Sequence, residues 1–121
     1  KQLTSDHSLV NELVKTGEIT PDMAERHPKK NVLVRSVGVP GNVEVDLSAV
    51  ETKANDYVLL CSDGLSNMLS DNEMKAIILQ DNSLIRKVNQ LSDEANEAGG
   101  RDNITALLID FKEVEKGGDS L

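Results

Sequence analysis

The chain has 121 residues, which is enough for one domain with a core and too few for several. Its 21 acidic and 13 basic residues give a net charge of −8 without a basic patch, which excludes nucleic acid as an expected partner. A single Cys excludes an internal disulfide framework, and no apolar run approaches the roughly 18 residues that cross a bilayer. We therefore expect a cytoplasmic protein with no membrane partner.

The first thirty residues predict two short helices and no core strand. Asp6 or Ser8 can cap a helix whose apolar residues 9, 10, 13 and 14 share one face and which Gly17 ends. Thr20 followed by Pro21 is a typical helix start.

Two strands are expected next, separated by a turn at residues 40–42. Residues 31–38 alternate between two largely apolar faces, and residues 43–47 alternate apolar with acidic side chains, as a half-exposed strand does.

The central stretch is the unbroken apolar run 57–61, which is typical of a strand buried on both faces. Asp63 follows this strand, where a carboxylate can be held rigidly and still meet water, a metal or a phosphate. Gly64 permits a sharp turn and close approach to the main chain.

The rest of the chain predicts two longer helices and a last strand. Residues 70–80 begin with a capping box, and residues 83–98 have the clearest amphipathic spacing in the sequence. Residues 104–111 form a nearly all-apolar strand, and residues 112–121 are expected to be a frayed tail.

Asp63 and Asp102 are the candidates for chemistry. Antiparallel neighbours would bring the exit of one strand beside the entry of the other, so the two carboxylates can meet. Two adjacent carboxylates suit a hard divalent cation such as magnesium or manganese. Each Asp also fits a plain turn-forming role, since Asp beside Gly is common in turns. We expect surface roles for His7 and His27, and a packing role for Cys61.

Four segments of the chain, at residues 4–8, 31–38, 59–65 and 100–105, resemble in order the motifs of the metal-dependent protein serine/threonine phosphatases of the type 2C (PPM) family. Residues 4–8 are similar to the family's Thr-x-Asp-His-Ser segment, and residues 31–38 to its Asn-x-Leu-x-Arg-x-Leu-Gly strand. Residues 59–65 and 100–105 resemble two late motifs that contain the Ser-Asp-Gly and Gly-Arg-Asp-Asn sequences. The end of the apolar pattern near Phe111 resembles the compact bacterial branch of the family.

The resemblance implies a function and a set of site residues. It implies hydrolysis of phosphoserine and phosphothreonine in protein substrates, with two or more magnesium or manganese ions in the complete enzyme and with Asp63 and Asp102 as metal ligands. Residues 8–30 correspond to a flap beside the active site, in which Met23 and Arg26 are the expected substrate-proximal residues.

The family's N-terminal motifs do not occur in this sequence, among them the Asp that bridges the two metals and an Arg that binds the substrate phosphate. Residues 1–121 are therefore expected to be the C-terminal part of one catalytic domain, inactive alone. We expect an α+β fold that is part of a β-sandwich of antiparallel sheets flanked by helices. One sheet face would need the N-terminal half or a second copy to cover it.

Two other classes stay open at this point. A receiver-type signalling domain is also acidic, has about this length and carries an Asp at a strand end, although the acidic pair of its first strand is missing here. A non-catalytic interaction module derived from a phosphatase is the second, and metal titration separates it from the enzyme.

Overall fold

A computed structural model describes residues 1–112, so the expected tail lies, apart from Lys112, outside the described residues. The chain forms two compact units, Lys1–Ala49 and a second that begins at Val50. Among the described residues, no helix is both long and apolar enough to traverse a bilayer.

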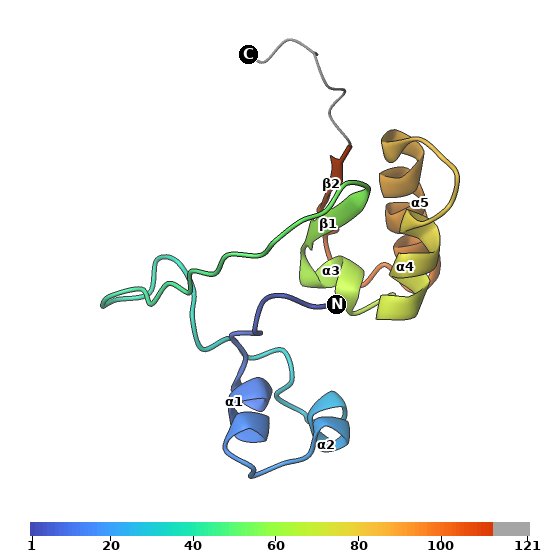
Figure 1. Cartoon of the computed structure of the whole chain (residues 1–121). Helices are drawn as coiled ribbons and strands as arrows, with labels where there is room; N and C mark the ends of the chain where they lie inside the picture. Colours follow the sequence, from blue (N-terminus) through green and yellow to red (C-terminus); the bar gives the residue numbers. More distant parts are fainter. Residues whose placement is uncertain (113–121) are drawn as a thin grey trace. The chain divides into compact units, whose positions relative to one another are not determined.

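The first unit contains the two predicted short helices (Figure 1). Helix α1, Leu9–Lys15, begins at Ser8, whose Oγ accepts a hydrogen bond from the Asn11 N–H at 3.3 Å. Helix α2, Pro21–Glu25, begins at Thr20 in the same way. Only α1 has a buried apolar residue, Val10, so this unit has little core of its own.

The strands predicted at residues 31–38 and 43–47 are wrong for this structure. Among residues 1–112, the only pairing that these segments make is an isolated bridge between Ser8 and Leu33. Val37 and Leu47 are each 93% exposed. A strand requires a neighbour for its backbone groups, and within residues 1–112 only the short segment around Ser8 provides one here.

The second unit is an antiparallel two-stranded sheet with helices packed on it (Figure 1). Its elements follow in the order β1 (Asp56–Cys61), α3 (Asp63–Ser66), α4 (Asp71–Ile78), α5 (Leu84–Glu97) and β2 (Ala106–Phe111). The pairing places Leu59 opposite Leu108 and Cys61 opposite Ala106. The α+β class is confirmed, and a receiver-type domain is contradicted because that fold is built on a parallel sheet.

A single core forms between the helices and one face of this sheet. Its buried members are Leu65, Leu69, Met74, Ile77, Leu91 and Ala95, with Leu59 and Ala106 packed against them. The predicted capping box is present, because Ser70 and Glu73 each accept a hydrogen bond from the other's backbone N–H. Helix α5 packs on β2 and α4 packs on α5, so the predicted position on the sheet is confirmed for α5 directly.

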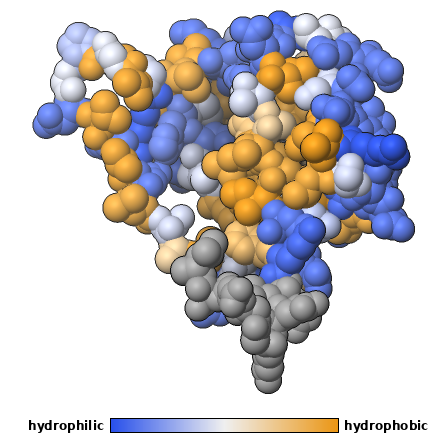
Figure 2. Space-filling view, turned by 90° about the horizontal axis from the view of Figure 1, so that it is seen from above, coloured by the Kyte–Doolittle hydropathy of each residue, from blue (hydrophilic) through white to orange (hydrophobic). Residues whose placement is uncertain are grey.

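The opposite face of the sheet stays open, so the prediction of a strand buried on both faces is wrong for this chain by itself. Residues directly opposite in an antiparallel pair share a face, which puts Leu60, Leu107 and Ile109 on the open side. Their exposed fractions are 52%, 57% and 38%. In the space-filling view, hydrophobic side chains gather into a continuous patch on the surface (Figure 2).

Candidate metal centre

The structure brings the turns of Asp63 and Asp102 to the same end of the sheet. Asp63 begins α3 directly after β1, and Asp102 lies in the loop that leads from α5 into β2. Because Cys61 is paired with Ala106, the exit of β1 lies beside the entry of β2. Both Asp residues are exposed, so their carboxylates remain accessible to water and ions.

Close packing of the main chain holds these two turns together. Gly64 is buried, and a Cβ built on it would clash with the backbone carbonyl oxygen of Asn103. Only glycine therefore lets the two backbones approach this closely.

Three hydrogen bonds add to this contact, and all involve Ser62. Its N–H donates to the Thr105 carbonyl at 2.9 Å, its Oγ donates to the Asn103 carbonyl at 3.2 Å, and its Oγ accepts from the Thr105 N–H at 3.0 Å. Sequence reasoning did not assign Ser62 a role. Its position between the end of a strand and Asp63 was the signal available.

The donor set fits a hard cation in kind but is incomplete. Two exposed carboxylates supply the oxygen ligands that magnesium and manganese prefer. One oxygen of Asp102 also accepts a hydrogen bond from the N–H of Asn103 at 2.7 Å. Within residues 1–112 no group of three or more His, Cys, Asp or Glu side chains could hold a metal ion. The two Asp residues are thus part of a ligand set.

Met23 and Arg26, the expected substrate-proximal residues, lie on the second helix of the first unit. Met23 is 52% exposed within α2, and Arg26 is the exposed residue that ends this helix. Residues three apart face the same side of a helix, so the two side chains share one accessible surface.

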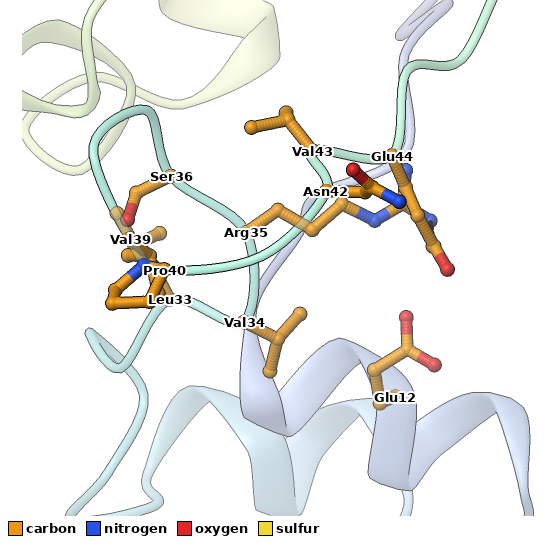
Figure 3. Close-up of a pocket in the computed structure, with 10 residues that line it drawn as sticks. All are labelled: Glu12, Leu33, Val34, Arg35, Ser36, Val39, Pro40, Asn42, Val43 and Glu44. Atoms are coloured by element: carbon orange, nitrogen blue, oxygen red, sulfur yellow. Dashed lines mark ion pairs between the residues drawn. The ribbon is translucent and has the colours of Figure 1, made fainter.

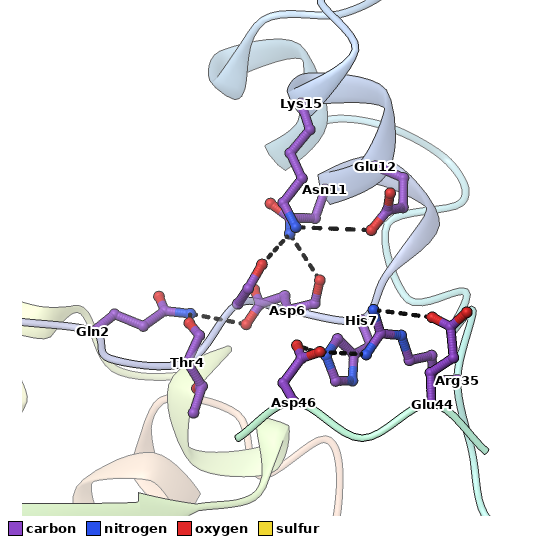
Figure 4. Close-up of polar contacts among 11 residues, drawn as sticks. Gln2, Thr4, Asp6, His7, Asn11, Glu12, Lys15, Arg35, Glu44 and Asp46 are labelled. Carbon is purple, nitrogen blue, oxygen red and sulfur yellow. Dashed lines mark hydrogen bonds and ion pairs between the residues drawn. The ribbon is translucent and has the colours of Figure 1, made fainter. Parts of the chain in front are cut away.

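A polar network in the first unit surrounds Asp46 (Figure 4). His7 Nε2 lies 2.8 Å from one carboxylate oxygen of Asp46, and Arg35 Nη1 donates to the other at 2.8 Å. The pKa of Asp46 is lowered to about 2 by this network. The hydrogen bond from Arg35 is the largest cause, and the hydrogen bond from His7 is the next largest. The predicted surface role of His7 agrees with its place in this network.

A groove of about 570 Å³ adjoins the network (Figure 3). Apolar side chains of residues 33–43 and polar groups line it in equal number, and the charged ones are Arg35, Glu12 and Glu44. Arg35 already pairs with Asp46 at 2.8 Å and with Glu44 at 3.4 Å, so two carboxylates of the chain itself balance its positive charge. The groove therefore lacks the chemistry of an anion site.

His27 and Cys61 add no catalytic group. His27 Nδ1 accepts a hydrogen bond from the backbone N–H of Lys29 at 3.0 Å, which is a turn-forming contact. Cys61 is exposed at the end of β1, contrary to the expected packing role. Partial burial raises the pKa of its thiol, which lowers its reactivity near neutral pH.

The chain is similar to known phosphatases in both sequence and structure. No protein-family model matches the chain. The chain is 48% identical over 120 residues to the serine/threonine phosphatase stp of Listeria welshimeri, covering 99% of this chain and 48% of that protein.

Solved structures of phosphatases are also similar to this chain. The serine/threonine phosphatase of S. agalactiae matches 89% of this chain and 45% of its own, with 46% identity and a TM-score of 0.86. The catalytic domain of the phosphatase PstP, in complex with 2 manganese ions, matches 93% of this chain and 46% of its own, with 32% identity and a TM-score of 0.76. The chain spans about half the length of the relatives that it matches.

Proposed function

Because the chain belongs to the PPM (type 2C) family of serine/threonine phosphatases, we propose that it forms part of an enzyme that hydrolyses phosphoserine and phosphothreonine in proteins. One observation carries the proposal. The two carboxylate turns meet at one end of β1–β2, in a chain that is 48% identical to a named phosphatase.

Asp63 and Asp102 are the proposed metal ligands, with magnesium or manganese as the cation. The manganese in the PstP complex supports this choice of chemistry. When bound, such a cation acidifies a water molecule and stabilises charge at phosphorus. The task of this chain is to hold two anionic oxygens at a fixed separation, which the packing of Gly64 against Asn103 supports.

Residues 1–121 are the proposed C-terminal part of a single catalytic domain. The open sheet face supports this reading, because Leu60, Leu107 and Ile109 would lose hydrophobic free energy if they stayed in water. The proposed cover is the N-terminal half of the same domain, since the chain spans 48% of its relative. A second copy of the chain is the alternative cover.

Residues 8–30 are the proposed flap beside the substrate. The exposed surface shared by Met23 and Arg26 supports a contact with phosphoprotein substrates. A guanidinium next to a thioether suits a peptide that carries both acidic and apolar groups.

Paired substitutions test the metal assignment in the full-length protein. Asp63→Asn and Asp102→Asn each remove a ligand charge at an exposed position, so turnover on a phosphopeptide should fall at least about 100-fold while the fold persists. Asp93→Asn, an exposed change on α5, is the matched control and should leave turnover unchanged.

Near-normal turnover of both ligand variants at saturating manganese would contradict the assignment. Calorimetric titration with manganese separates the remaining alternative, a non-catalytic interaction module. Such a module would show no manganese binding that depends on Asp63 or Asp102, so neither Asp substitution would change the titration.

A further inference from the structure

We infer that Ser62 is a positioning residue whose hydroxyl sets the Asp102 turn against the Asp63 turn. This inference rests on the proposed metal site and assigns a role to a residue that contacts no ligand itself.

The need for the hydroxyl arises where the ladder between β1 and β2 ends. Beyond the pair Cys61–Ala106, the next residues in register are Ser62 and Thr105. The Ser62 N–H donates to the Thr105 carbonyl at 2.9 Å, as in a regular antiparallel pair. The reciprocal bond would require the Ser62 carbonyl to accept from the Thr105 N–H.

That carbonyl is used elsewhere. The chain turns from strand to helix at Ser62, and the carbonyl of Ser62 accepts a hydrogen bond from the Leu65 N–H at 3.1 Å in the first turn of α3. The side chain takes its place, because Ser62 Oγ accepts from the Thr105 N–H at 3.0 Å. The hydroxyl thus continues the ladder by one residue after the backbone has left it.

The same hydroxyl also fixes the turn that carries Asp102. Its proton is donated to the Asn103 carbonyl at 3.2 Å, one residue from the carboxylate. Residues 98–105 contain no helix or strand, and Gly99 and Gly100 both have positive φ. Contacts with Ser62 and Gly64 therefore restrain this turn on the side of β1, and the packing of Ile104 on the core restrains its other end.

Removing the hydroxyl leaves the Thr105 N–H and the Asn103 carbonyl without these partners. The Asp102 turn can then move relative to Asp63, and two ligands held loosely bind a cation less tightly. Changes to groups that orient metal ligands typically weaken metal affinity about 10- to 100-fold.

Manganese affinity of the full-length protein tests the inference by calorimetry, independently of turnover. Ser62→Ala should weaken manganese binding about 10- to 100-fold. Ser62→Thr keeps the hydroxyl at a half-exposed position and should restore affinity to within about threefold of the unchanged protein, well inside the loss expected without it.

Ser70→Ala is the matched control for stability. It also removes a serine hydroxyl that accepts a backbone N–H, at 3.2 Å, but in the cap of α4. It should lower the melting temperature about as much as Ser62→Ala and leave manganese affinity unchanged. If Ser62→Ala does not fold, Ser62→Cys provides a weaker donor and acceptor and should give an intermediate affinity.

Two results would overturn the inference: equal manganese affinity for Ser62→Ala and Ser70→Ala, or equal losses for Ser62→Ala and Ser62→Thr. The proposed function fails separately, if Asp63→Asn and Asp102→Asn both keep their manganese affinity and turnover. An effect of the Asp variants without one of Ser62→Ala would therefore refute the role of Ser62 alone.

Discussion

Apolar segments pair as strands in the second unit of the chain and do not form a sheet in the first. In the second unit, β1 and β2 pair with each other and one face is covered by α4 and α5. In the first unit, residues 31–38 and 43–47 also carry several apolar side chains, yet Val37 and Leu47 are almost fully exposed and no ladder forms among the described residues. An apolar segment therefore becomes a strand only where the same chain supplies its neighbour.

The strongest test of this comparison is the behaviour of residues 1–121 alone. With one sheet face open and the ligand set incomplete, the isolated chain should show no phosphatase activity and should self-associate. Light scattering and a phosphopeptide assay measure both. Adding the N-terminal half should restore a 1:1 complex with activity. A cooperatively folded monomer that hydrolyses phosphopeptides would contradict both expectations.

Within the second unit, the largest effect on stability should come from Leu91. This side chain is fully buried between α5 and the sheet, so Leu91→Ala should cost about 2–5 kcal/mol of the free energy of unfolding in the full-length protein. Ile85→Ala, on the same helix but 72% exposed, should stay within about 0.5 kcal/mol. Denaturant titration measures both, and equal costs would show that Ile85 is also covered.

For the first unit, substitutions in the proposed flap should change substrate selection more than metal chemistry. Met23→Ala or Arg26→Ala should reduce kcat/KM on phosphopeptides about 3- to 20-fold, as lost surface contacts do, and leave a small aryl phosphate nearly unaffected. Equal losses on both substrates, together with weaker manganese binding, would place this segment in the metal site instead.

The smallest expected effect is on the titration of Asp46. Its pKa is lowered from 3.8 to about 2, mainly by the hydrogen bond from Arg35. The stabilisation that this network provides is therefore complete above pH 3.8 and lost as the pH falls through about 2. Carboxyl NMR should show this midpoint rise toward 3.8 in Arg35→Gln, less in His7→Ala, and not at all in the control Glu18→Gln.

Sequence patterns predicted the second unit well because its determinants are local. The capping box at Ser70, the cap at Ser83 and the apolar stripe that contains Leu91 each lie within a few residues of the structure they specify. Both strands of the sheet were also located, and their pairing follows from two apolar runs with compatible lengths. The meeting of the Asp63 and Asp102 turns is a direct consequence of that pairing.

Other features depend on partners that spacing does not identify. The role inferred for Ser62 depends on its carbonyl being used by α3, which no spacing rule predicts. Lys87 is only 3% exposed, and its Nζ lies 3.0 Å from the Tyr57 hydroxyl and 4.4 Å from the ring centre. Its position three residues after Leu84 and four before Leu91 puts it on the buried stripe of α5, which was the available signal.

Cys61 offers a single site for chemical labelling of this chain. It is the only thiol in the sequence, it is exposed, and it lies two residues before Asp63. A nitroxide or fluorescent reagent attached there would report manganese occupancy through paramagnetic broadening or quenching. Because partial burial raises the pKa of this thiol, alkylation should be slow at neutral pH and faster as the buffer becomes more alkaline. Labelling is therefore best completed before the metal is added.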